Sequence, residues 1–328
     1  MGIKHVLLNY VADELSHILS RVSDSLFEDL REVRLRAGRP ILLAHNGGEL
    51  TVKADGLVCA TIQEGFCPSR AHLAKCIEMI SDYSLYACEE ELKNGYLTLP
   101  GGYRVGVTGR AVLSENGVKT IRNINGLNFR ICREVKGCAD NVMPHVVERR
   151  MLHTLIISPP GCGKTTLLRD MVRHLSNGVD GLLAGQTVAV ADERSEIAGC
   201  YLGVPQLDVG IRTDVLDGCP KAEGMMMLLR SMSPHVIAAD EIGKETDIAA
   251  IEAVINSGVT LICTIHGSSV EDIKKRDTIA ALLSRNIFSR FVVLERPGRI
   301  KAIYNEKLVN IYRRSGQKLT ETRTVQKG

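Results

Sequence analysis

The sequence predicts an α/β protein in which a C-terminal region with a mainly parallel sheet is preceded by a smaller α+β domain. Three observations support this prediction. From about residue 153 onward, apolar segments alternate with helical patterns, as in strand–helix–strand units. These apolar segments are continuous, as in strands buried on both faces of a parallel sheet. Before that point, segments of alternating polarity are punctuated by Gly and Asn, which favours antiparallel pairing.

The length of 328 residues suggests two domains. We expect an α+β domain at residues 1–140 and the parallel-sheet domain at residues 141–313, because Gly137, Pro144 and a charged EVKG segment interrupt the pattern between them. The polar stretch 314–328 predicts a disordered tail.

The N-terminal elements follow from periodicity and turn residues. Val33 and Leu35 alternate with arginines, and Gly-rich turns flank the next apolar segment, which indicates a hairpin. Ser69 is a suitable helix N-cap, and Gly95 is a suitable stop. The expected elements are helices at 11–22 and 24–30, a hairpin over 32–50, one or two helices within 69–93, and antiparallel strands over 96–133.

The C-terminal elements follow from the apolar runs and their punctuation. Gly258 ends one helical pattern, and Pro297-Gly298 marks the turn of a terminal hairpin. The expected strands are 153–158, 187–191, 235–240 and 259–266, the hairpin spans 290–305, and the helices cover about 164–174, 221–232 and 245–258. The segment 209–221, VGIRTDVLDGCPK, is predicted to be a loop.

Composition and charge exclude several classes of protein. With 45% hydrophobic and 24% charged residues the chain is globular. Its 41 basic and 38 acidic residues give a net charge of +3, which offers no argument for a nucleic-acid partner. The absence of Trp and the presence of only five Phe also make aromatic platforms for bases a poor expectation. The ten cysteines form no CxxC pair, so we expect buried free thiols in a reducing cytosol.

The hydropathy pattern predicts a cytoplasmic protein without direct membrane insertion. No run of 18 or more apolar residues is long enough to span a bilayer. The apolar stretch before Asp13 is too short for a signal peptide. Docking on a membrane protein remains compatible with this pattern.

The strongest motif is SPPGCGKTT at residues 158–166, between an apolar strand and a helix, which predicts a phosphate-binding loop. The glycines allow consecutive backbone N–H groups to point at phosphate oxygens, Lys164 should reach the β- and γ-phosphates, and the Thr165 hydroxyl should ligate Mg²⁺. Ser158 replaces the first Gly of the usual GxxxxGK[ST] pattern, and a glycine-rich helix start without a ligand is the alternative. The residues expected to bind ATP are Gly161, Cys162, Gly163, Lys164, Thr165 and Thr166.

An acidic site should accompany this loop, because Mg²⁺ needs a carboxylate at the end of a neighbouring strand. The segment HVIAADE supplies Asp240 on the Mg²⁺ side and Glu241 to orient and polarise the attacking water. A solvated strand end would give the same pattern, and the phosphate loop is what favours the functional interpretation.

Two further strand ends carry polar residues, and the carboxyl ends of parallel strands meet at one crevice. Asp192, Glu193 and Arg194 follow one strand, and Thr264 and His266 end another. We expect His266 to sense the γ-phosphate and Glu193 to belong to the catalytic set.

Three arginines could contact phosphate in cis or from a neighbouring subunit: Arg194, Arg212 and Arg230. A salt bridge to a nearby acid is an equally good interpretation of each. Arg212 is the strongest candidate for catalysis, because its polar, Gly-rich segment suits a loop that faces another subunit.

The segments LLRSMSPHVIAADEIG and ETDIAAIEAVINSGVTLICTIHGSS resemble the Walker B and His-box regions of type II and type IV secretion ATPases. That family usually has Gly before its catalytic Glu and Arg soon after it, whereas this chain has Asp240 and then Ile242, Gly243 and Lys244. The acidic box of the family resembles Asp192 and Glu193. The matched positions are Arg230, Pro234, Glu241, Gly258, Thr264 and His266.

Segments from EVRLRAGRP to TIHG, spread over residues 31–267, are similar to a sporulation branch of these ATPases. The resemblance implies a RecA-like P-loop NTPase core, an ATP hydrolase that uses Mg²⁺. It further implies a homo-hexamer favoured by ATP, located in the mother-cell cytoplasm. There it would power a membrane-embedded, secretion-like channel complex between mother cell and forespore.

Two other functions stay open from the residues alone. A nucleic-acid-stimulated RecA-like ATPase could use the arginines at 31, 34, 36 and 39, although a solvated strand face is the preferred interpretation. A nucleotide-binding scaffold without turnover is the third hypothesis, against which the intact Lys164, Thr165, Asp240 and Glu241 argue.

Overall fold

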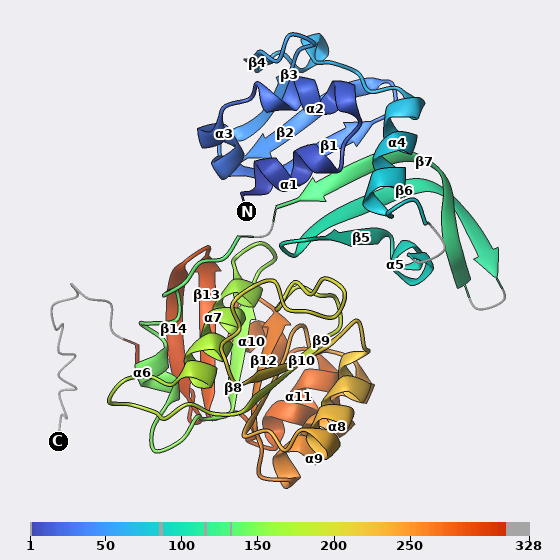
Figure 1. The fold of residues 1–328 in the computed structure, drawn as a ribbon. Helices are drawn as coiled ribbons and strands as arrows, with labels where there is room; N and C mark the ends of the chain where they lie inside the picture. The colour runs from blue at the N-terminus through green and yellow to red at the C-terminus, as the bar shows by residue number, and fades with distance from the viewer. Residues whose placement is uncertain (1, 85–87, 115–116, 132, 313–328) are drawn as a thin grey trace, which may run out of the picture. The chain divides into compact units, whose positions relative to one another are not determined.

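The computed structural model of the protein describes residues 2–84, 88–114, 117–131 and 133–312 (Figure 1). The chain divides into two compact units. The first contains Met1–Glu134 together with Ala198–Asp208, and the second contains Val135–Ile197 and Val209–Gly328. The tail expected to be disordered, 314–328, lies outside the described residues.

The first unit is built on an antiparallel sheet with the strand order β4-β3-β2-β1-β7-β6-β5. Its helices are α1 (Ile3–Asn9), α2 (Asp13–Ser20), α3 (Asp24–Asp29), the 3₁₀ helix η1 (Ile62–Glu64), α4 (Arg70–Ile80) and α5 (Glu89–Lys93). Its strands are β1 (Leu30–Arg36), β2 (Arg39–His45), β3 (Gly48–Val52), β4 (Val58–Cys59), β5 (Tyr96–Leu99), β6 (Tyr103–Ser114) and β7 (Gly117–Arg130).

Local sequence explains most of this unit. In β1, Val33 and Leu35 are fully buried in the core, whereas Arg34 points to the other face and pairs with Glu32. Ser69 caps α4 by accepting a hydrogen bond from the backbone N–H of the third helical residue. The helix α1 was not predicted from the sequence.

The segment 198–208 belongs to the first unit although it follows a strand of the second. The backbone of Gly199 lies so close to Gly102 that a Cβ on Gly102 would be 2.9 Å from the Gly199 carbonyl oxygen. Gln206 accepts a hydrogen bond from the Gly101 N–H at 2.9 Å, and Glu134 accepts one from the Asp208 N–H at 2.6 Å. Nothing in the sequence pattern indicated this association.

The second unit contains a sheet with the strand order β10-β9-β11-β12-β8-β13-β14, parallel except for the last pair. Its helices are α6 (Met143–Val146), α7 (Lys164–Asn177), α8 (Lys221–Ser231), α9 (Glu245–Asn256), α10 (Val270–Ile273) and α11 (Asp277–Ser284). Its strands are β8 (Thr154–Ser158), β9 (Val188–Asp192), β10 (Thr213–Asp217), β11 (Val236–Ala239), β12 (Thr260–His266), β13 (Arg290–Arg296) and β14 (Arg299–Asn305).

The predicted mainly parallel sheet is confirmed. Every residue of β8, β9 and β11 is buried, as the continuous apolar runs require. The predicted loop at 209–221 is partly wrong, because Thr213–Asp217 forms the edge strand β10. Every residue of this strand is half-buried, and its sequence TDVLD has only two consecutive apolar residues, which is too short an apolar run to detect.

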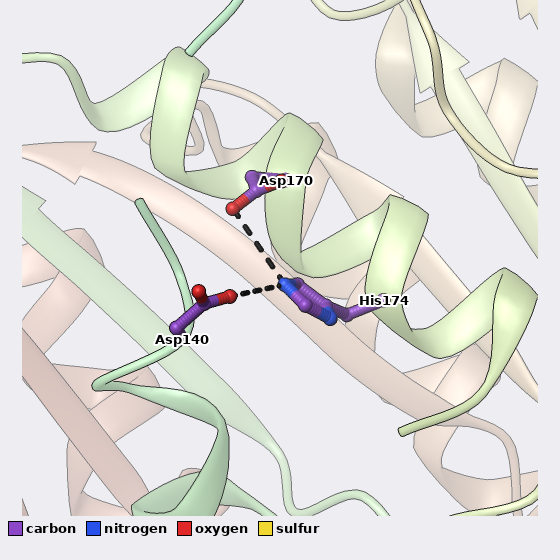
Figure 2. Close-up of side chains that lie close together, drawn as sticks. All are labelled: Asp140, Asp170 and His174. Atoms are coloured by element: carbon purple, nitrogen blue, oxygen red, sulfur yellow. Dashed lines mark ion pairs between the residues drawn. The ribbon is translucent and has the colours of Figure 1, made fainter. Parts of the chain in front are cut away.

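The start of the second unit is attached to the phosphate-loop helix α7 by a polar cluster (Figure 2). Asp170 of α7 is 3% exposed, accepts a hydrogen bond from the Ala139 N–H at 2.8 Å, and pairs with Arg173 at 2.7 Å. The Nε2 of His174 lies 2.8 Å from Asp140 and 3.8 Å from Asp170. The cluster has the ligand types of a metal site, but Arg173 already supplies the cation that balances Asp170.

Replacement of Asp170 with Asn should lower the free energy of unfolding by about 3 kcal/mol, because it leaves the Arg173 guanidinium without its buried partner. Burial raises the pKa of Asp170, but the Ala139 N–H and Arg173 outweigh it, so the pKa lies below its ordinary 3.8. The stabilisation is therefore complete above that ordinary pKa and is lost as the pH falls through the lowered one. Urea unfolding at a series of pH values measures this.

The control is Asp140→Asn. Asp140 contacts the same histidine but is 64% exposed, so we expect a loss below about 1 kcal/mol. Equal losses in the two variants would contradict the assignment of Asp170 as the anchoring carboxylate.

The nine described cysteines are free thiols. Cys76 and Cys263 are fully buried, as expected from their apolar sequence context. Burial raises the pKa of the Cys76 thiol to about 11, which keeps it protonated and unreactive at neutral pH. Among the described residues, no helix combines the length and apolar character needed to cross a membrane.

Candidate nucleotide-binding site

The predicted phosphate loop lies between β8 and α7, in the strand–loop–helix context that its motif requires. Gly161 and Gly163 have φ angles of +72° and +83°, a region that other residues rarely adopt. They let the chain turn sharply into α7, whose first N–H groups, as in any α-helix, have no carbonyl partners inside the helix. This end of α7 is therefore a ready site for an anion.

The other loop positions have structural contacts. Cys162 is buried, and its Sγ lies 3.5 Å from the Glu295 carbonyl oxygen. Thr166 accepts a hydrogen bond at its carbonyl oxygen from Cys138 Sγ at 3.6 Å. Ser158, which stands where the motif usually has Gly, is a fully buried end of β8 and accepts the Gly267 N–H at its carbonyl oxygen.

Lys164 and Glu241 form an ion pair with an Nζ to Oε1 distance of 2.7 Å. Lys164 is 7% exposed, and the same Glu241 oxygen lies 2.6 Å from the Nε2 of His266. The outer Glu241 oxygen lies 3.2 Å from Arg194, whose side chain is 65% exposed. The structure thus brings one carboxylate into contact with three cationic or ionisable side chains that the sequence had singled out.

Asp240 faces the hydroxyl groups of two threonines. Its Oδ2 accepts a hydrogen bond from Thr165 Oγ1 at 2.5 Å, and its Oδ1 accepts one from Thr264 Oγ1. Lys164 Nζ is 3.7 Å from Oδ1. β12 lies between β8 and β11 in the sheet, so its end supplies Thr264 beside both strand ends.

Electrostatics and backbone geometry distinguish Glu241 from an ordinary surface acid. Burial raises its pKa, but Lys164 and then His266 outweigh that effect, so the pKa lies below its usual value and the group is a carboxylate at neutral pH. Its φ angle is +53°, which is unusual for a residue other than Gly and is often found at functional sites. Hydrogen bonds from its N–H to Asp240 and Thr264 hold this conformation.

The acidic segment after β9 divides into two roles. Asp192 is 2% exposed and accepts hydrogen bonds from the N–H groups of Glu196 and Ile197, so it fixes the turn that follows the strand. Glu193 is free to face the site and contacts Lys221 and Lys244. Lys221, the first residue of α8, is a site residue that the sequence analysis missed.

The structure separates Arg212 and Arg230 from this cluster. Arg212 precedes β10, at the opposite end of the sheet from the phosphate loop, and donates to the Ser176 carbonyl oxygen at 2.9 Å. Arg230 is exposed in the last turn of α8. This geometry does not bring Arg212 to the phosphate loop of its own chain, and its action from a neighbouring subunit stays a prediction beside the structural contact with Ser176.

The donors around Thr165 fit Mg²⁺. This cation prefers oxygen ligands, and it commonly uses one hydroxyl or carboxylate of the protein together with phosphates and waters. Thr165 Oγ1 and the Asp240 carboxylate are already within hydrogen-bond distance, and Asp240 is in turn oriented by Thr264.

Solved structures of ATPases share this fold. The ATPase DotB of Legionella pneumophila has a TM-score of 0.53 and 18% identity, with 82% of this chain and 73% of that chain covered. The pilus retraction motor PilT with bound ADP has a TM-score of 0.53 and 13% identity, with coverages of 80% and 74%. At these identities the likeness concerns the fold.

Sequence comparison is more specific. Stage III sporulation protein AA of Bacillus subtilis (strain 168) is 41% identical over 297 residues, which are 90% of this chain and 92% of the relative. The uncharacterised protein ycf45 of Cyanidium caldarium is 26% identical over 281 residues, 83% of this chain and 74% of the relative. The family described as "Sporulation stage III, protein AA" matches residues 2–311. The chain therefore belongs to the family of sporulation stage III protein AA.

Proposed function

We propose that this protein is a Mg²⁺-dependent ATP hydrolase. The observation that carries the proposal is the meeting of the phosphate loop with the two acids after β11: Lys164 with Glu241 at 2.7 Å and Thr165 with Asp240 at 2.5 Å. A helix start without a ligand would need neither a buried lysine facing two carboxylates nor a hydroxyl paired with one of them.

In this proposal each group of site residues has a separate role in the hydrolysis of ATP. The N–H groups at the start of α7 and the Lys164 ammonium bind the β- and γ-phosphates. Glu241 orients a water molecule and accepts its proton as the oxygen attacks the γ-phosphorus and the bond to the β–γ bridging oxygen breaks. Mg²⁺ held through Thr165 and Asp240 would neutralise charge on the phosphate oxygens. The proposal gives His266 the role of sensing the γ-phosphate, and its contact with Glu241 at 2.6 Å supports this.

Lys164 has to exchange partners in this scheme. In the structure its ammonium faces the Glu241 carboxylate at 2.7 Å, whereas ATP binding requires it to face phosphate oxygens. The exchange releases Glu241 for the water and couples ATP binding to a rearrangement of the site. Such coupling is what a motor requires.

We further propose that the protein works as a homo-hexamer favoured by ATP, at the cytoplasmic face of a membrane-embedded channel complex in sporulating cells. Membership of the sporulation family and the secretion-ATPase fold support this assignment. In a ring, Arg194 or Arg212 could reach the nucleotide of a neighbouring subunit.

The test is ATP turnover by the purified full-length protein with Mg²⁺, with excess EDTA, and with single-stranded DNA. We expect slow hydrolysis that EDTA abolishes and DNA leaves unchanged. Asp240→Asn should raise the Mg²⁺ concentration needed for half-maximal activity by about tenfold, because asparagine has no negative charge to attract the cation and only one oxygen to accept from Thr165 and Thr264. An unchanged Mg²⁺ dependence would exclude Asp240 from the metal site.

The other outcomes decide between the hypotheses. Strong stimulation by DNA with a steep salt dependence would replace the motor proposal with a nucleic-acid-stimulated ATPase. Tight ATP binding without turnover would replace it with a nucleotide-binding scaffold. Size measurement with a non-hydrolysable ATP analogue tests the hexamer.

A further inference from the structure

A small cavity lined by charged residues lies beside Asp240 and Glu241, the two acids that follow β11. Its volume is about 20 Å³, which is room for a single water molecule. Acidic and basic side chains from three separate segments of the second unit line it, among them Asp192, Glu193, Arg194, Lys221, Asp240 and Glu241. A water here would lie between the Glu241 carboxylate and the segment after β9.

Lys221 is an unusual residue for its place in this wall. It is 7% exposed, and a lysine is rarely buried unless it is paired. It is also the first residue of α8, where the partial positive charge of the helix N-terminus disfavours a cation. The positive charge of Lys221 therefore does not stabilise α8. The presence of a buried lysine at this position is explained by its ion-pair partner instead.

That partner is Glu193. The Lys221 Nζ makes a short contact with Glu193 Oε2, inside the wall of the cavity. Burial raises the pKa of Glu193, but Lys221 and then Lys244 outweigh it, so the group is ionised at neutral pH. Without Lys221, this half-buried carboxylate would keep only the exposed Lys244 as a partner and would turn toward solvent or toward Arg194, because a partly desolvated carboxylate that loses its buried cation is unfavourable there.

We propose that Lys221 is a positioning residue that holds the Glu193 carboxylate against the one-water cavity beside Glu241, where the two acids together orient the attacking water. The inference rests on the proposed ATP hydrolysis and extends it to a residue outside the phosphate loop and the strand ends.

The chain contains a matched control on the same carboxylate. Lys244 Nζ lies 3.4 Å from the other Glu193 oxygen, but its side chain is 67% exposed, whereas that of Lys221 is 8% exposed. Solvent screens the exposed contact, so Lys244 contributes little to the position of Glu193. Comparison of variants at the two lysines therefore distinguishes the effect of a buried ion pair with Glu193 from the effect of a positive charge near it.

The experiment measures kcat for ATP, affinity for a fluorescent ATP analogue, and the melting temperature of full-length wild type, Lys221→Met, Lys244→Met, Glu193→Gln and the double variant Lys221→Met/Glu193→Gln. We expect Lys221→Met to lower kcat at least about tenfold while nucleotide affinity stays within about twofold, because the change affects the water and not the phosphates. Lys244→Met should change kcat by less than about twofold.

The double variant keeps the inference testable if Lys221→Met folds poorly. It removes both members of the buried pair, so it should fold, and its kcat should equal that of Glu193→Gln because the lysine acts through the glutamate. A kcat at the wild-type level in Lys221→Met or in Glu193→Gln would overturn the inference, as would a double variant slower than Glu193→Gln alone. If the wild type itself does not hydrolyse ATP, the proposed function fails instead.

Discussion

Glu241→Gln should lower the turnover of ATP by about a thousandfold, because glutamine is nearly the same size but cannot accept the proton of the attacking water. ATP binding should be preserved or become tighter by up to about tenfold. The Lys164 ammonium loses the carboxylate at 2.7 Å and keeps only that of Asp240 at 3.7 Å, so it is more available to phosphate. The variant would therefore trap ATP.

Single-turnover hydrolysis and equilibrium binding of a fluorescent ATP analogue, measured on the same preparation, separate the two effects. Glu245→Gln is the control: Glu245 lies four residues further along the chain, is exposed in the first turn of α9, and should leave both quantities unchanged. Turnover by Glu241→Gln at the wild-type rate would remove Glu241 from the chemical step, and weakened binding would contradict the competition for Lys164.

Lys164→Ala should move nucleotide affinity in the opposite direction. We expect binding about a hundredfold weaker, because a buried ammonium makes charge-assisted hydrogen bonds to phosphate that no other described lysine in the loop can replace. Hydrolysis should fall below detection at ordinary ATP concentrations. Equilibrium binding titrations extended to high nucleotide concentration measure the loss.

Lys274→Ala is the control variant. Lys274 is an exposed lysine beyond β12, so this substitution removes the same charge from the protein surface, away from the loop. Opposite shifts in affinity for Lys164→Ala and Glu241→Gln would support the exchange of partners at Lys164. A Lys164→Ala variant that binds ATP like the wild type would refute the phosphate-binding role of the loop.

The parts of the fold that could be predicted are those with a local cause. The alternation of Val33 and Leu35, the cap at Ser69 and the continuous apolar runs of the parallel strands each leave a signal within a few residues. β10 left no such signal, because an edge strand of half-buried residues does not need an apolar run.

The candidate site shows the same limit. Residues at strand ends next to the phosphate loop could be named, because parallel strands place their carboxyl ends together. Lys221 could not, since its partner Glu193 is 28 residues away and only the packing of α8 brings them together. Arg212 was placed at a catalytic position because its segment resembled a loop, whereas the edge strand that follows it sets it at the far end of the sheet.

The association of residues 198–208 with the first unit has a practical consequence. The polypeptide passes from one unit to the other three times, so neither unit corresponds to one uninterrupted stretch of the gene. A fragment that stops at Glu134 would lack the partners of Gly101 and Gly102 and should be prone to aggregation. Excision of the ATPase-like half would likewise require a short linker in place of 198–208, joining residues 197 and 209.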